Sequence, residues 1–146
     1  MKITSPVFEN NKPIPKKYSC DGDNINPSLE IFGVPKGAKS LVLIMDDPDA
    51  PIGTFIHWVI FNINPLTSLI EENSVPKNAI EGLNSAKKHS YLGPCPPSGI
   101  HHYYFKLYAL DMMLNLDSSS DKADVEKSME GHILEAANLI GTYERW

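Results

Sequence analysis

One aspartate and two histidines stand beside stiff, proline-rich stretches and are the residues of this chain best suited to bind a ligand. Asp47 opens Asp-Pro-Asp-Ala-Pro (47–51), His57 follows that stretch, and His101 follows Gly-Pro-Cys-Pro-Pro (93–97). A carboxylate beside a histidine orients the ring and favours its charged form. The backbone amides of a stiffened loop can converge on an oxyanion. These residues could therefore make a small-anion site, on the hypothesis that both histidines contact the anion and Asp47 orients them.

Each of these residues also has a purely structural explanation. Asp47 and Asp49 could accept hydrogen bonds from turn amides, as acids near proline turns commonly do. His57 and His101 could be core histidines bonded to carbonyl groups. Because both histidines follow rigid loops into apolar runs, the pair favours a site over two unrelated core positions.

Two other kinds of site use the same residues. Asp47, His57, His101 and Cys95 could support hydrolysis or acyl transfer. However, the chain has no nucleophile motif such as G-x-S-x-G, and no nearby base is spaced to activate Cys95, so we expect this cysteine to be a pocket wall. The aspartate and the two histidines would also suit a metal, but we expect no metal and no cofactor.

The runs on either side of the first loop predict two adjacent strands. Residues 39–45 are apolar on both faces, which is typical of a central strand. Residues 55–63 are rich in β-branched and aromatic side chains, which favours a strand over a short helix. Proline has no amide to donate to a strand ladder, so the intervening Asp-Pro-Asp-Ala-Pro predicts a stiff turn.

A third strand is expected at 100–110, directly after the second loop. Alternation with a period of two places His101 and Tyr103 on its more apolar face, so His101 is expected to point inward. Shorter strands are expected at 3–8 and 28–32.

The end of the chain predicts a helix. Between 121 and 143, apolar residues such as Val125, Met129 and Ile133 recur every three or four positions. Asp121 and Asp124 fall in the first turn, where the helix dipole favours acids.

Composition narrows the function classes. The 146 residues are enough for one domain with its own core (1–146). A net charge of −5 argues against nucleic acid, which needs a basic face. The chain has no run long enough to span a bilayer and no secretory h-region, so we expect a cytoplasmic protein without a transmembrane segment.

The two cysteines, Cys20 and Cys95, lack a C-x-x-C partner. A reducing cytosol fits two free thiols better than a disulfide, although a bridge remains open if the fold brings them together. The acids around Asp21 and Asp23 hint at a calcium loop, but the expected glutamate is missing and Phe32 stands in its place, so a hydrogen-bonded polar loop is expected.

Four motifs occur in one order along the chain: Asp47-Pro48-Asp49-Ala50-Pro51, His57-Trp58, Gly93-Pro94-Cys95-Pro96-Pro97 and Gly99-Ile100-His101-His102-Tyr103. Their order resembles the phosphatidylethanolamine-binding protein family, also called the Raf kinase inhibitor protein family. The segments 20–27 and 129–134 are similar to its prokaryotic branch, and the resemblance covers nearly the whole chain.

The resemblance implies a mainly β (α+β) fold, in which a large antiparallel sheet packs on a smaller one as a sandwich with peripheral helices and a C-terminal helix. It implies an anion pocket at one end of the large sheet. The residues that it places there are Asp47, Pro51, His57, Gly93, Cys95, Pro96, Pro97, His101 and Tyr103.

The resemblance also implies a function. We expect a non-enzymatic protein that binds phosphate or a phosphorylated headgroup, with a kinase or protease as a possible protein partner and a homodimer as a possible assembly. Three departures bear on this expectation. His102 stands where the family usually has an arginine, and the segments before His57 and His101 are shorter than in eukaryotic relatives, which favours a small anion over a large lipid.

Overall fold

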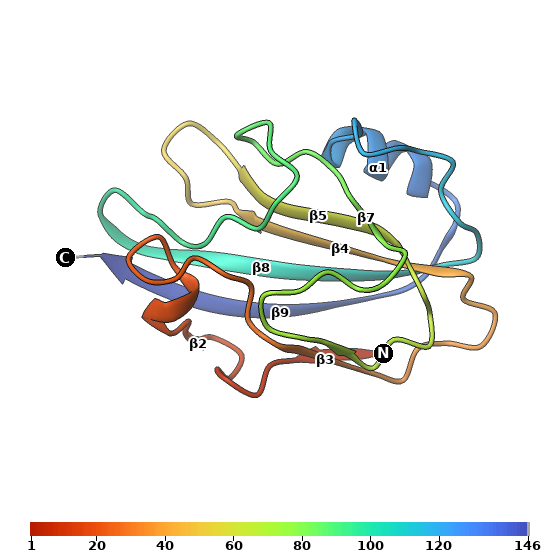
Figure 1. Ribbon diagram of the computed structural model, residues 1–146, viewed down its shortest axis with the longest axis horizontal. Helices are drawn as coiled ribbons and strands as arrows, with labels where there is room; N and C mark the ends of the chain where they lie inside the picture. The colour runs from red at the N-terminus through yellow and green to blue at the C-terminus, as the bar shows by residue number, and fades with distance from the viewer. Residues whose placement is uncertain (146) are drawn as a thin grey trace.

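Two β-sheets and one short α-helix make up the part of the chain that the computed structural model describes, residues 1–145 (Figure 1). The elements in chain order are β1 (Lys2–Thr4), β2 (Lys12–Pro13), a 3-10 turn (Lys16–Tyr18), β3 (Leu29–Phe32), β4 (Ser40–Asp47), β5 (Phe55–Ile63), β6 (Leu69–Ile70), β7 (Ile80–Glu81), β8 (Gly99–Leu110), α1 (Lys122–Met129) and β9 (Ile133–Arg145). The expected mainly β architecture with two packed sheets is confirmed.

The large sheet has the strand order β2-β9-β8-β4-β5-β7. β4 lies inside it between β8 and β5, antiparallel to both, and every residue of β4 is buried. This confirms the central strand predicted from its two apolar faces. Because β4 is antiparallel to β5 and β8, the β4–β5 loop and the loop before β8 lie at the same end of the sheet (Figure 1).

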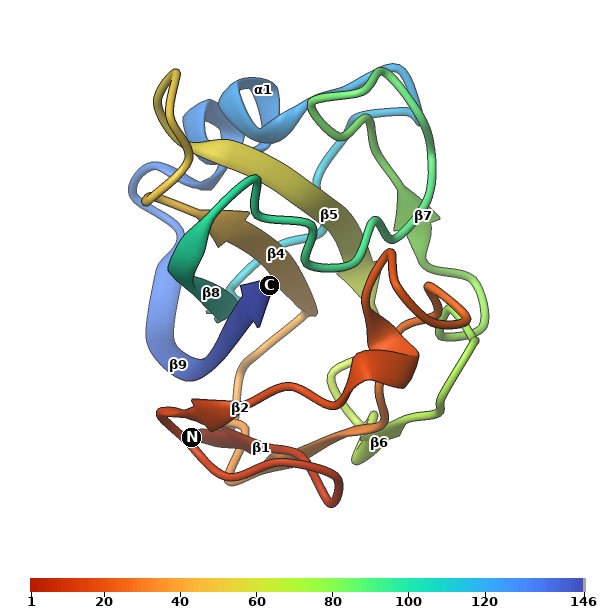
Figure 2. The same cartoon turned by 90° about the vertical axis from the view of Figure 1, so that its left-hand side faces the viewer.

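The small sheet, in the order β1-β3-β6, packs against one face of the large sheet (Figure 2). The main core lies between the two sheets. Along β4 and β8, side chains that point into this core alternate with side chains that point away from it. The inward ones include Leu43, Met45, Phe105 and Leu107. Tyr103 and His101 continue this inward row on β8. The prediction that His101 points inward is therefore confirmed.

A second apolar cluster covers the opposite face of the large sheet. Val42 and Ile44 of β4 pack there with Val125 and Met129 of α1. α1 begins with a reciprocal cap in which Asp121 and Asp124 each accept a hydrogen bond from the other's backbone amide. This cap satisfies two of the amides that a helix start leaves free, and it agrees with the predicted helix start.

The predicted helix over 121–143 is wrong beyond its first two turns. α1 ends at Met129, Gly131 adopts a left-handed φ of 78°, and β9 follows from Ile133 to Arg145. β9 pairs with β8 along the whole length of β8, so its backbone groups are satisfied by a neighbouring strand instead of a helical turn. No helix within residues 1–145 is long and apolar enough to cross a membrane.

The strands predicted at 28–32, 39–45, 55–63 and 100–110 correspond to β3, β4, β5 and β8. The first strand is shorter than predicted and ends at Thr4, before Pro6. The sequence did not indicate the two-residue strands β2, β6 and β7, which pair at the edges of the sheets.

Candidate functional site

A pocket of about 350 Å³ opens at the end of the large sheet where the two proline-rich loops meet. All the site residues predicted from the sequence line it. The lining residues are Cys20, Asn24, Asp47, Ala50, Pro51, Phe55, His57, Leu92, Gly93, Cys95, Pro96, Pro97, His101 and Tyr103. The volume is in the range of small-ligand sites in proteins.

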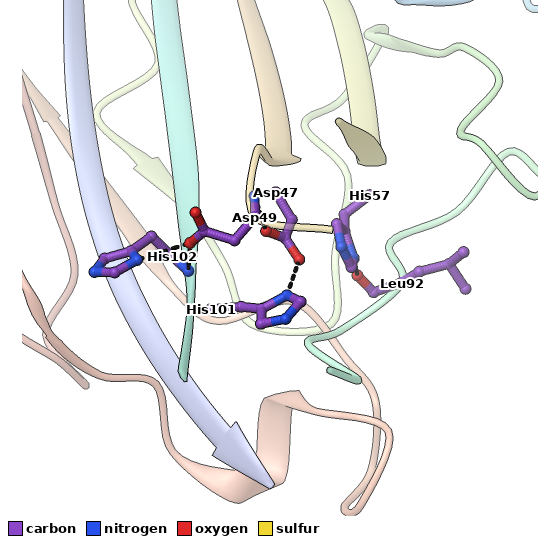
Figure 3. A network of polar contacts seen from close by, with 6 residues as sticks. All are labelled: Asp47, Asp49, His57, Leu92, His101 and His102. Atoms are coloured by element: carbon purple, nitrogen blue, oxygen red, sulfur yellow. Dashed lines mark hydrogen bonds and ion pairs between the residues drawn. The ribbon is translucent and has the colours of Figure 1, made fainter. Parts of the chain in front are cut away.

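Asp47 and His101 form a buried pair in this pocket (Figure 3). Asp47 Oδ2 lies 2.6 Å from His101 Nδ1, and the two residues are only 3% and 7% exposed. Because a carboxylate only accepts, Nδ1 carries the hydrogen, and the ring orientation is fixed. His101 Nε2 makes no hydrogen bond within residues 1–145, so a ligand could use it.

Asp47 also performs the structural role that the sequence left open. Its Oδ1 accepts a hydrogen bond of 2.8 Å from the backbone amide of Asp49. One oxygen therefore stabilises the turn while the other holds His101. Asp47 therefore caps the turn and contacts His101 at the same time, and the turn keeps its carboxylate in place.

His57 is held by the loop before β8 rather than by an acid. Its Nδ1 lies 2.7 Å from the carbonyl oxygen of Leu92 (Figure 3). A carbonyl only accepts, so Nδ1 carries the hydrogen. Burial lowers the pKa of His57, and the Leu92 carbonyl and the nearby Asp47 only partly oppose this effect. The ring is therefore neutral at pH 7, and its Nε2 is an acceptor.

Tyr103 forms the floor of the pocket between the two histidines. Its ring centroid lies 5.2 Å from that of His57, edge to face, and 6.4 Å from that of His101. Burial and the nearby Asp47 raise the pKa of its hydroxyl. This hydroxyl is buried and has no hydrogen-bond partner among the described residues, which is uncommon for a buried polar group.

His102 and Asp49 form a second histidine–aspartate pair outside the pocket lining. Asp49 Oδ2 accepts hydrogen bonds of 2.8 Å from both the backbone amide and Nδ1 of His102. The His102 hydrogen bond is the main reason that the pKa of Asp49 is lowered. His102 thus ties the β4–β5 loop to β8 at an exposed position.

Sequence reasoning missed Cys20 and Asn24 as pocket residues. Asn24 Oδ1 accepts a hydrogen bond of 2.7 Å from the Gly93 amide, which leaves the Asn24 side-chain amide group free to donate. A side chain at Gly93 would place its Cβ only 2.2 Å from the Tyr18 carbonyl oxygen. The turn after the 3-10 helix and the second loop are therefore in close contact. The polar composition of 20–27 was a signal for a loop but not for its place in the fold.

The two cysteines are joined, which corrects the expectation of free thiols. Cys20 and Cys95 form a disulfide with a Cα–Cα distance of 5.5 Å. The fold brings the turn before Asn24 against the second loop, where the Cys20 amide also donates to the Pro94 carbonyl. Free thiols would have supported a cytoplasmic location. Because the two cysteines are bonded, that support is lost, and the cytoplasmic location stays a prediction.

The calcium loop was not expected, and Asp21 has a different role. It pairs with Arg145 at 3.1 Å and accepts a hydrogen bond from the Tyr143 hydroxyl. Among residues 1–145, no group of three His, Cys, Asp or Glu side chains is arranged to hold a metal ion. Asp47, His57 and His101 are not such a group. Asp47 contacts His101, whereas His57 contacts the carbonyl oxygen of Leu92.

Comparisons with known proteins agree with this architecture. Residues 4–144 match the family described as phosphatidylethanolamine-binding protein. The chain is 49% identical over 150 residues to a UPF0098 protein of Methanothermobacter thermautotrophicus, covering 99% of both chains. It is 45% identical to a UPF0098 protein of Chlamydia trachomatis, again over 99% of both.

Two solved structures are similar over nearly the whole chain. One is described as a homolog of phosphatidylethanolamine-binding protein from Chlamydia trachomatis, with a TM-score of 0.96, 44% identity and coverage of 99% of this chain and 97% of that chain. The other is YbcL of E. coli, described as a new member of the mammalian family, with a TM-score of 0.92, 29% identity and coverage of 99% and 98%.

Proposed function

Because the chain belongs to the phosphatidylethanolamine-binding protein family, we propose that its pocket binds a small anion, phosphate or a phosphorylated headgroup, without transforming it. The observation that supports this most directly is the buried Asp47–His101 pair in an open pocket. Asp47 accepts from His101 Nδ1 and fixes the ring, and a protonated imidazole can donate from Nε2 to an anionic oxygen.

His57 has a different part in this proposal from the one expected. At neutral pH its Nε2 accepts, so it does not donate to an oxyanion as His101 does. It accepts a hydrogen bond from an O–H or N–H group of the ligand. A phosphate that keeps one proton, or a phosphate ester that carries an ammonium group, offers such a donor beside its negative oxygens. The two histidines therefore favour these ligands over a fully deprotonated anion.

Asn24 and Tyr103 complete the set of donors. The free side-chain amide of Asn24 and the unpartnered Tyr103 hydroxyl belong to the same pocket lining. Neither group is ionised at neutral pH. The Asn24 amide can donate to a phosphate oxygen directly. The Tyr103 hydroxyl is buried and has no hydrogen-bond partner among residues 1–145, so it can donate to the ligand only after the pocket lining in front of it moves aside.

The enzyme alternative has no supporting observation in the pocket. Cys95 is in a disulfide, so it is not available as a nucleophile while the bond is intact. Regulation of a kinase or protease, and a homodimer, stay predictions that rest on the family resemblance. A panel of ester, phosphoester and peptide substrates tests for catalysis. Turnover that His101→Ala abolishes would replace the binding proposal.

Titration with inorganic phosphate and with phosphoethanolamine tests the proposal, read by the ring resonances of the five histidines. The resonances of His57 and His101 should shift and saturate together. His89 is exposed and is not among the pocket residues, so its resonance serves as an internal control. Unshifted resonances of both pocket histidines, at millimolar ligand, would contradict the proposal.

A further inference from the structure

The Cys20–Cys95 disulfide forms part of the pocket wall and is open to solvent on one side. Both cysteines line the pocket, Cys95 is exposed, and Cys20 is half-buried. A disulfide that serves only stability has no need of access to a binding pocket. We propose that this bond is a thiol-exchange site, on which a small monothiol forms a mixed disulfide with Cys95 and thereby obstructs the pocket.

Arg145 is placed to stabilise Cys95 when this sulfur is released as a thiolate. Its Nη1 lies 3.5 Å from Cys95 Sγ, while its Nε pairs with Asp21 Oδ1 at 3.1 Å. Asp21 is itself held by the Tyr143 hydroxyl at 2.9 Å. A nearby cation stabilises a thiolate, so a Cys95 thiolate released in the reaction has a counter-ion already positioned beside it.

The segments that carry the two cysteines are joined by contacts that do not need the bond. The Cys20 amide donates to the Pro94 carbonyl at 3.1 Å, and the Gly93 amide donates to Asn24 Oδ1 at 2.7 Å. The Tyr91 hydroxyl donates to the Tyr18 carbonyl at 2.7 Å. These hydrogen bonds keep the two sulfurs near each other after the bond opens, so closure is intramolecular and the exchange is reversible.

The exchange has two steps. In the first, the thiolate of the monothiol attacks Cys95 Sγ, because Cys95 is exposed and Cys20 is half-buried. A new S–S bond forms, the electron pair of the old bond goes to Cys20 Sγ, and Cys20 takes a proton from water. In the second, another monothiolate attacks the external sulfur of the mixed disulfide and releases Cys95 as a thiolate beside Arg145. Two molecules of thiol are oxidised to their disulfide, and the protein disulfide is reduced to two thiols.

The effect of this chemistry on the ligand rests on the proposed function, whereas the chemistry itself does not. The first step leaves the external group on Cys95, which lines the pocket. A substituent of the size of glutathione is comparable to the 350 Å³ pocket. It therefore competes with the anion for the same space.

The first experiment treats the oxidised protein with glutathione, quenches with acid and measures the intact mass. One glutathione per chain should be found, and peptide mapping should place it on Cys95. No other cysteine exists to confuse the assignment. An adduct on Cys20, or direct passage from oxidised to fully reduced protein across a series of glutathione concentrations, would overturn the proposal.

The second experiment compares Arg145→Gln with Arg145→Lys. Release of Cys95 from the mixed disulfide should slow about threefold or more when the charge is removed, because the leaving thiolate loses its counter-ion. Arg145→Lys should restore most of the rate, which a purely structural role of the guanidinium would not predict. Equal rates for the three proteins would overturn the role of Arg145.

The third experiment titrates phosphate into the unmodified protein and into the purified Cys95 adduct. Affinity should fall at least tenfold in the adduct. Equal affinities would overturn the obstruction, and the mass measurement would still report the exchange site. If the unmodified protein binds no phosphate, the proposed function fails, while the adduct on Cys95 stands or falls by the first experiment.

Discussion

Asp46 and Asp47 are neighbours at the end of β4, both are buried, and they serve opposite faces of the large sheet. Asp46 Oδ2 lies 2.9 Å from Lys106 Nζ and 3.1 Å from Lys122 Nζ, and Lys122 is the first residue of α1. Asp47 instead faces His101 at 2.6 Å in the pocket. The period of two along a strand thus separates two carboxylates that adjoin in sequence.

The partners explain why one face is structural and the other suits binding. Lysine keeps its charge through the neutral range, whereas histidine gains or loses a proton near pH 6.5. The cluster around Asp46 is therefore a fixed attachment of α1 to the sheet. The pair around Asp47 has a ring nitrogen without a hydrogen-bond partner among residues 1–145, and it opens to a pocket. A buried acid thus does not by itself indicate a binding site. Its partner and its access to solvent decide whether it can take part in binding.

The largest expected effect comes from Asp46→Ala, which should destabilise the protein by about 2 kcal/mol because two lysines lose their buried counter-ion. The lysines keep some solvent contact, with side chains 28% and 19% exposed, so the loss stays below that of a fully buried pair. Urea unfolding measures it. Phosphate affinity of the folded variant should change less than about twofold; a large loss of affinity would show that the two faces are not separate.

Asp47→Asn should have the opposite profile. Phosphate affinity should fall about tenfold, or about 1.4 kcal/mol, because a neutral amide holds the Nδ1–H group of His101 less firmly than the carboxylate does. The substituted side chain keeps a carbonyl oxygen that can accept from the Asp49 amide, so the free energy of unfolding should change by less than about 1 kcal/mol. Calorimetric titration and urea unfolding on the same sample check both. Unchanged affinity would remove Asp47 from the binding role.

The loss of unfolding free energy at acid pH should depend on His57. Burial lowers the pKa of His57 in the folded protein below its ordinary value of 6.5, so the unfolded chain takes up the proton first. The stabilisation is complete above pH 6.5 and is lost as the pH falls towards the folded-state pKa, at up to about 1.4 kcal/mol per pH unit. His57→Gln should flatten this slope in unfolding experiments between pH 7 and 5, and His89→Gln should not. Equal slopes in all three proteins would contradict the assignment.

The exposed His102–Asp49 pair gives the smallest effect. Its two side chains are 47% and 40% exposed, so His102→Ala should cost about 0.5 kcal/mol or less, and high salt should reduce this cost. The same two residue types should cost more when buried, as they are in the pair of Asp47 and His101. A loss well above 1 kcal/mol in thermal unfolding would mean that the β4–β5 loop depends on this contact.

Local patterns were sufficient for the strands that carry the pocket. The apolar runs at 39–45, 55–63 and 100–110 contain enough β-branched and aromatic residues to identify β4, β5 and β8, and alternation along β8 gave the direction of His101. The site residues came from the family resemblance, and they lie near the ends of these strands and in the adjoining loops. Their ligand-binding role is not tested by the fold and stays a proposal.

The features that the sequence did not reveal depend mostly on partners that lie far away along the chain. Ile133 to Arg145 has apolar spacing compatible with a helix, and only the free edge of β8 makes it a strand. The Cys20–Cys95 bond links positions 75 residues apart, so no local spacing could indicate it. Asn24 was missed as a pocket residue for the same reason, because its contact with Gly93 joins two distant parts of the chain. Two-residue strands such as β2 carry too little pattern to be recognised.

The Cys20–Cys95 bond also divides the covalent architecture of the large sheet. It closes a ring that contains β4, β5 and β7, while β2, β8 and β9 belong to the two tails outside the ring. In the strand order β2-β9-β8-β4-β5-β7, the seam between tails and ring falls between β8 and β4. Asp47 lies on the ring and His101 on a tail, so the pair that defines the pocket bridges this seam. A single protease cut within the ring leaves both pieces of the chain covalently attached, whereas a cut between β8 and β9 releases a fragment that only non-covalent contacts retain.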